Sequence, residues 1–172
     1  MNLEPSNFRF IGILPYSYNE KGELLFLLGR ERAEAGWTDQ LKWSGFGGKP
    51  EKIDNSIYEA AAREGYEETM GIFGNKNELL QKLVDKKEAY IDNESITFTL
   101  EIDYAPNLSI LFRNIYNYIK ESSNNHKLGY LEKIDVRYFT PDEIINNKSI
   151  MRPAFYNSFQ KNIYSRLKRI NW

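Results

Sequence analysis

Residues 47–72, GGKPEKIDNSIYEAAAREGYEETMGI, are the stretch that decides the fold. Ser56 and Glu59 form the pattern of a capping box, in which a hydroxyl and a carboxylate accept the free amides of a first helical turn. Good helix formers continue from residue 60 to about residue 70, and Gly71 is a suitable C-terminal stop. The sequence therefore predicts a glycine-containing loop that leads directly into a helix.

Three glutamates crowd one face of this predicted helix. Glu64, Glu67 and Glu68 stand at i, i+3 and i+4, so their carboxylates project from the same side. Acids at this spacing repel one another and usually form a solvated surface. A hard divalent cation is the other way to stabilise them, because Mg²⁺ prefers oxygen ligands and often shares them with phosphates.

The loop before the helix favours the divalent cation over the solvated surface. Gly47 and Gly48 let the backbone approach a ligand closely, and their carbonyls offer a further metal ligand. Lys49 can reach a phosphate group. Loop and helix together predict a site for a metal-bound diphosphate.

This segment resembles the signature of the Nudix hydrolase family, whose members include MutT-like proteins. In that signature a Gly precedes an acid, and an Arg-Glu pair is followed by two adjacent glutamates, a Gly and an apolar residue. The loop form Gly-Gly-Lys-x-Glu is present at 47–51. Residues 63–68 keep the spacing of the family's core, and Gly71 and Ile72 match its end.

The segment also departs from the family pattern, without losing an acid of the core. Asp54 stands where the family has Glu, and eight residues rather than seven separate it from Arg63. Met70 is an extra residue before Gly71. Gly65 occupies a normally apolar position, where it should weaken the helix by about 1 kcal/mol relative to Ala and leave room for a bulky neighbour.

The resemblance implies hydrolysis at phosphorus with Mg²⁺ or Mn²⁺ as cofactor. The ions would bind Glu64, Glu67 and Glu68 together with a carbonyl of Gly47 or Gly48. There they would neutralise the diphosphate and lower the pKa of a bound water.

Two further residues complete the expected catalytic set of Arg63, Glu64, Glu67 and Glu132. Arg63 would orient Glu64 or Glu67 through a charge-assisted hydrogen bond. The family's general base is either a helix glutamate or an acid from a later loop, and Glu132 fits the second case because it precedes Tyr138 by a family-like interval. Glu132 is equally consistent with a solvated strand-edge glutamate, and Glu101 and Asp103 are weaker candidates.

The expected substrate is a nucleoside diphosphate linked to another group, cleaved at its diphosphate. Lys49 and Gly48 would contact phosphates, Trp37 or Trp43 would stack on a base, and Arg152 would touch a phosphate. For Trp43 the alternative is packing, and for Arg152 it is capping of the final helix.

Two other functions remain open on the sequence alone. The aromatic-rich composition resembles viral and protist members of the family, which makes capped RNA an alternative substrate. A non-catalytic nucleotide-binding or RNA-binding module is the other alternative, although inactive members typically lose acids that are retained here. His126, the only histidine, is expected at the surface.

The rest of the chain predicts strands mixed with helices. Apolar runs predict strands at 8–15, 23–30, 96–104 and 130–139, and helical spacing predicts helices at 108–119 and 154–169. A second capping box begins at Thr140. The lack of regular βαβ alternation indicates an α+β fold, and the resemblance specifies a Nudix-type α/β/α sandwich with a mixed sheet.

Composition bounds the remaining possibilities. The 172 residues suit one domain over 1–172, and a net charge of −1 does not demand a nucleic-acid or membrane partner. The absence of cysteine argues against an isopentenyl diphosphate isomerase of the same fold, which uses a cysteine. Without a signal-like N-terminus or a long apolar run, we expect a cytoplasmic monomer or homodimer.

Overall fold

The computed structural model describes residues 3–86, 88–122 and 129–170. Its strands are β1 (Phe10–Tyr18), β2 (Leu24–Glu31), β3 (Trp43–Ser44), β4 (Phe46–Gly48), β5 (Ala89–Asp92), β6 (Ser95–Glu101) and β7 (Lys133–Phe139). Its main helices are α1 (Ile57–Glu68), α2 (Lys76–Lys86), α3 (Leu108–Ser122), α4 (Pro141–Asn146), α5 (Pro153–Ser158), the π-helix η4 (Phe159–Tyr164) and α6 (Ser165–Ile170). Short 3-10 turns lie at η1 (Pro5–Asn7), η2 (Gly129–Leu131) and η3 (Lys148–Ile150).

The strands form one mixed sheet, as predicted. Its order is β3-β2-β1-β6-β5, with β4 also pairing β1 and β7 also pairing β2. β1 runs antiparallel to β2 and β4 but parallel to β6. The Asn19 side chain stabilises the β1–β2 turn, because it accepts from the amides of Lys21 and Glu23 at 3.0 and 2.9 Å.

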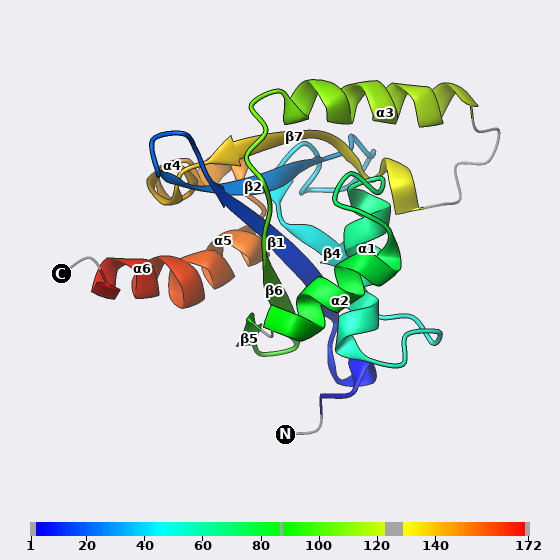
Figure 1. Ribbon diagram of the computed structural model, residues 1–172, viewed down its shortest axis with the longest axis horizontal. Helices are drawn as coiled ribbons and strands as arrows, with labels where there is room; N and C mark the ends of the chain where they lie inside the picture. The colour runs from blue at the N-terminus through cyan, green and yellow to red at the C-terminus, as the bar shows by residue number, and fades with distance from the viewer. Residues whose placement is uncertain (1–2, 87, 123–128, 171–172) are drawn as a thin grey trace.

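Helices cover both faces of the sheet, so the predicted α/β/α sandwich is confirmed (Figure 1). On one face Ile11, Ile13 and Leu27 pack against α1, α2 and α3. On the other face Leu14 and Phe26 pack against α4, α5 and η4. The alternation of these side chains along β1 and β2 gives the sheet two buried faces, which explains why both strands read as continuous apolar runs.

Glycines at the contact points let α1 and β4 pack closely against β1. A Cβ at Gly65 would lie 2.8 Å from the Ile13 Cδ1 atom, so the unusual glycine does leave room for a bulky neighbour. A Cβ at Gly12 would lie 2.3 Å from the Phe46 carbonyl oxygen, and one at Gly47 would lie 2.5 Å from the Gly12 Cα. The glycine loop therefore lies directly against the central strand.

The first predicted capping box forms only in part. The Ser56 hydroxyl accepts from the Glu59 amide at 3.1 Å, but the Glu59 carboxylate accepts from the Asn55 amide instead of closing the box. The helix ends at Glu68, because Met70 and Gly71 adopt positive φ values of 54° and 73°. The capping box at Thr140 forms completely.

Helix α2 and strand β5 are among the elements that were not predicted, and strand β6 differs from the prediction. α2 buries only Leu79 and Leu83, and β5 is a half-buried edge strand, so neither has a strong apolar pattern. β6 ends at Glu101 rather than residue 104, and Thr99 is buried although a half-buried strand was expected. In the described part of the chain, no helix is both long and apolar enough to cross a membrane.

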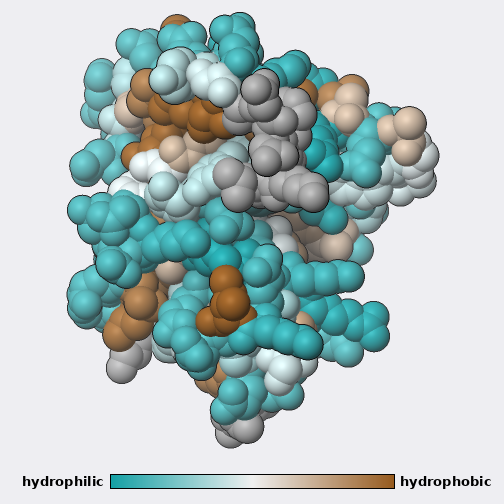
Figure 2. Space-filling model, turned by 90° about the vertical axis from the view of Figure 1, so that its right-hand side faces the viewer, coloured by the Kyte–Doolittle hydropathy of each residue, from teal (hydrophilic) through white to brown (hydrophobic). Residues whose placement is uncertain are grey.

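Helix α3 carries apolar side chains on its outer surface as well as its inner one. Leu108 and Phe112 are buried against the sheet, but Leu111 is 49% exposed. Ile110 is 53% exposed. Figure 2 views the molecule from the right-hand side of Figure 1. It shows a mostly hydrophilic surface on which hydrophobic residues gather in separate groups.

Candidate active site

The centre of the site is the buried guanidinium of Arg63 on α1. Its Nε and Nη2 donate to the two carboxylate oxygens of Asp54 at 3.1 and 2.9 Å, and Nη2 also donates to the Lys49 carbonyl at 3.2 Å. Its Nη1 donates to Glu64 at 2.9 Å and to Glu67 at 3.3 Å. One cation thus ties the preceding loop to the helix and holds two of the three helix acids.

Asp54 braces this loop. Its side chain is only 3% exposed, and its Oδ2 also accepts from the Glu51 amide at 2.7 Å. Burial alone would lower the pKa of Arg63, but hydrogen bonds and charge from Asp54 and Glu64 raise it well above its usual value. The guanidinium is therefore a permanent cation here.

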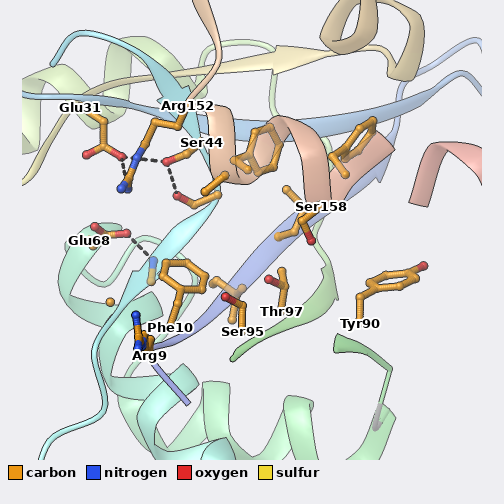
Figure 3. A pocket seen from close by; sticks show the side chains of 18 of the residues that line it. Arg9, Phe10, Glu31, Ser44, Glu68, Tyr90, Ser95, Thr97, Arg152 and Ser158 are labelled. Carbon is orange, nitrogen blue, oxygen red and sulfur yellow. Dashed lines mark hydrogen bonds and ion pairs between the residues drawn. The ribbon is translucent and has the colours of Figure 1, made fainter. Parts of the chain in front are cut away.

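The two loop glycines contact the other side of the helix acids. The Gly47 amide donates to Glu68 Oε2 at 2.6 Å (Figure 3). A Cβ at Gly48 would lie 2.7 Å from Glu64 Oε1, so only glycine lets this carboxylate come so close to the loop. The glycine-containing loop and the acidic turn of α1 are therefore in direct contact.

Burial disfavours the charged forms of two of the acids. Burial raises the pKa of Glu64 to about 7; the Arg63 charge and hydrogen bond lower it, and the nearby Glu67 and Glu132 carboxylates raise it. Burial likewise raises the pKa of Glu68 to about 8, against a lowering by Lys133. Carboxylates that gather at low exposure with raised pKa values are typical of a functional site.

The donor set suits a hard divalent cation, although the side chains are turned toward protein partners. Within residues 3–86, 88–122 and 129–170, no group of three or more His, Cys, Asp or Glu side chains is arranged to hold a metal ion. Arg63 holds Glu64 and Glu67, and Glu68 binds the Gly47 amide. Since all the ligands at this turn would be oxygens and a cation would relieve their crowding, the residues fit Mg²⁺ or Mn²⁺.

A cavity of about 450 Å³ opens beside the glycine loop. Figure 3 shows Glu68, Glu31 and Arg152 on one side of it and Tyr90, Thr97 and Ser158 on the other. The wall away from Glu31 and Glu68 comes from β1, β5, β6, α5 and η4 and is apolar and hydroxyl-bearing; its residues include Phe10, Leu14, Tyr90, Ser95, Thr97, Phe155, Ser158 and Phe159. A planar, uncharged ring is the kind of group that such a wall can bind.

A second, more polar cavity of about 470 Å³ adjoins the same site. Glu31, Trp37 and Glu132 line both cavities, and Arg32 and Glu34 line the second alone. Glu132 is exposed and directly precedes β7. Glu132 is close enough to Glu64 and Glu68 for its charge to contribute to raising the pKa values of both.

Not every predicted substrate contact lies in the cavity. Lys49, Gly48 and Arg152 line it. Among the described residues Trp37 lines it and Trp43 does not, because Trp43 packs on Phe139 with ring centroids 5.3 Å apart. The assignment of Trp43 to substrate is therefore corrected to a packing role.

The remaining candidates fall elsewhere or outside the described residues. Glu101 is bound by Lys86 at 2.6 Å, away from the helix acids. His126 lies outside the described residues.

Sequence reasoning missed a buried polar network next to the site. Glu31 Oε1 accepts from the Lys133 ammonium, from Ser44 Oγ at 2.8 Å and from Arg152 Nη1 at 3.1 Å. Lys133 Nζ also lies 3.7 Å from Glu68 Oε1. The available signal was a charged residue at the end of one apolar strand, Glu31 in β2, and at the start of another, Lys133 in β7. Such a residue more often marks the point where a strand reaches solvent.

Comparison with known proteins identifies a family whose profile matches most of the chain. The family profile of the NUDIX domain matches residues 10–161. A Nudix hydrolase from M. smegmatis, RenU, is 12% identical with a TM-score of 0.48, over 96% of this chain and 86% of that one. The MutT protein from Methanosarcina mazei Go1 is 23% identical with a TM-score of 0.44, over 92% and 94%. No curated protein sequence matches this chain.

The raised pKa values predict how stability depends on pH without divalent cations. In the folded protein Glu64 and Glu68 hold protons that they release in the unfolded chain, where the carboxyl pKa is 4.5. The free energy of unfolding should therefore fall as pH rises from about 5 to 8. Urea unfolding in EDTA at both pH values measures the fall. Glu68→Gln should reduce it by at least about 1.4 kcal/mol, the value of one pKa unit. An unchanged fall in this variant would show that Glu68 is not held protonated by burial.

Proposed function

Because the chain belongs to the NUDIX domain family, we propose that it is a Mg²⁺-dependent pyrophosphohydrolase that cleaves a nucleoside diphosphate linked to another group. It is an enzyme that acts on phosphoanhydride bonds, as the family assignment implies. The observation that carries the substrate proposal is the cavity that ends at Gly47, Gly48 and Glu68. Its end at the glycine loop suits a diphosphate, and its apolar wall suits a base.

The helix acids would hold the cation. Glu64, Glu67 and Glu68 would offer their carboxylates and Gly47 a carbonyl, and of these residues Glu68 and Gly47 line the cavity. Mg²⁺ bound there supplies positive charge for the diphosphate oxygens and lowers the pKa of a water. Arg63 acts as a positioning residue, since its hydrogen bonds to Glu64 and Glu67 fix both carboxylates against the loop.

The chain's other residues would bind and orient the substrate. Lys49 and Arg152 line the cavity, and their positive charges would contact phosphate oxygens. The phenyl and hydroxyl side chains of the apolar wall would pack on a nucleobase and exclude water. The second cavity, which shares Trp37 with the first, leaves room for the group on the other side of the diphosphate.

Glu132 is the proposed general base. Glu132 is exposed and lines both cavities, and its charge acts on Glu64 and Glu68. It can therefore accept a proton from a water that attacks phosphorus. Glu64 has the raised pKa of about 7 that also suits a base, but Arg63 engages its Oε1.

The basic side chains of η4 and α6 give little support to capped RNA as the substrate. Lys161 pairs with Asp92 at 2.6 Å, and Lys168 lies 3.8 Å from Asp142. Arg166 stacks over Tyr90 at 5.2 Å. Side chains that already bind their own chain are less available to phosphates of an RNA.

The proposal is tested by a double substitution of two helix acids. Glu67→Gln with Glu68→Gln should lower turnover by at least ~100-fold, because both carboxylates are proposed ligands, while circular dichroism stays unchanged. Activity is measured with Mg²⁺ on nucleoside triphosphates, nucleotide sugars, dinucleoside polyphosphates and capped RNA. The control is Glu59→Gln on the same helix, whose carboxylate binds the Asn55 amide. Full activity of the double variant on every substrate cleaved by the wild type would contradict the assignment.

Substitution of Glu132 tests the general base. Glu132→Gln should lower kcat by ~10²–10⁴-fold with a small change in KM, since the variant keeps its shape but cannot accept the proton. Glu101→Gln serves as the control because its partner is Lys86, away from the cavity. A kcat close to wild type for Glu132→Gln would leave Glu132 without a catalytic role.

A further inference from the structure

Lys133 is a buried cation between two carboxylates that come from different elements. Its ammonium donates to Glu31 Oε1 and to Ser44 Oγ, the latter at 3.0 Å, and lies 3.7 Å from Glu68 Oε1. The side chains of Lys133, Glu68 and Glu31 are 1%, 3% and 4% exposed. Because little water screens them, each charge acts strongly on the others.

The Lys133 ammonium lies closer to the Glu31 carboxylate than to the Glu68 carboxylate. Glu31 is in direct contact with it, whereas Glu68 is at ion-pair distance only and takes its hydrogen bond from the Gly47 amide. Glu31 also accepts from Arg152 at 3.1 Å. Glu31 is therefore the group that keeps the Lys133 charge away from the helix acid.

The backbone and its neighbours hold Lys133 in this place. Glu31 and Lys133 are partners in the antiparallel β2–β7 ladder, next to an irregularity between Arg30 and Glu31. A Cβ at Gly29 would lie 2.9 Å from the Lys133 Cδ atom, so the aliphatic part of the lysine fills the space above this glycine. The ammonium thus has little freedom to leave the two carboxylates.

We propose that Lys133 is an internal counter-ion that sets the divalent-cation affinity of the α1 turn, with Glu31 controlling how much of its charge acts on Glu68. The inference rests on the proposed function, because it takes Glu68 to be a ligand of the cation. Lys133 and Glu31 are positioning residues in this scheme.

Two substitutions that break the same ion pair should then change cation affinity in opposite directions. Glu31→Gln removes the carboxylate that holds the ammonium, so the full charge of Lys133 acts on Glu68 and Mn²⁺ should bind about tenfold more weakly, equivalent to ~1.4 kcal/mol. Lys133→Met leaves two buried carboxylates without their cation, so Mn²⁺ should bind about tenfold more tightly. Destabilisation of the fold alone would shift both variants the same way.

The experiment is calorimetric titration of the full chain with MnCl₂, without substrate. Thermal unfolding with and without Mn²⁺ gives a second readout that does not depend on activity. Matched controls are Lys86→Met and Glu101→Gln, which break an exposed ion pair of 2.6 Å away from the site and should leave Mn²⁺ affinity unchanged. If Lys133→Met folds only when Mn²⁺ is added, that requirement supports the proposal, because the ion then replaces the ammonium.

The outcomes separate this inference from the proposed function. Opposite shifts for the two variants support the counter-ion role. The counter-ion role would be overturned, although the metal site would stand, if Mn²⁺ affinity shifted equally in both variants or in neither. It would also be overturned if Glu31→Gln kept its Mn²⁺ affinity while Lys133→Met stayed unfolded with Mn²⁺. A wild-type chain that takes up no Mn²⁺ would overturn the proposed function together with this inference.

Discussion

The structure depends on one buried ion cluster, in which Arg63 joins the glycine-containing loop to the acidic helix. Its guanidinium binds both oxygens of Asp54 and the Lys49 carbonyl on the loop side, and Glu64 and Glu67 on the helix side. A buried cation needs such partners, because without them its charge would be uncompensated at a cost of about 3–5 kcal/mol. This cluster fixes the loop against the helix, beside the cavity that Gly47 and Gly48 line.

A second buried cation, Lys133, approaches the same helical turn from the sheet. Arg63 engages the outer acids of the turn, and Lys133 lies near the inner one, Glu68. The two cations stabilise a crowd of carboxylates that would otherwise repel one another. Such an arrangement can fold before any divalent ion arrives and still offer oxygen ligands to one, since protein cations and metal ions stabilise the same acids.

Short-range features of the site could be predicted from sequence, and long-range ones could not. The acids at 64, 67 and 68 share a helix face, and Arg63 reaches its neighbours on the same helix, so spacing alone predicts these contacts. The Glu31–Lys133 pair joins residues 102 positions apart, and it depends on the β2–β7 register, which no local pattern specifies. Similarly, only the path of the loop between β2 and β3 decides that Trp37, rather than Trp43, lines the cavity.

The central claim is that the α1 turn and the glycine loop bind divalent cations between them. The most direct measurement is diffraction from crystals soaked in MnCl₂, collected at the manganese absorption edge. We predict anomalous density between the carboxylates of Glu64, Glu67 and Glu68 and the backbone of Gly47, with the Glu64 carboxylate turned from Arg63 toward the ion. Density at other acids only, or none at this turn while Arg63 keeps both Glu64 and Glu67, would contradict the claim.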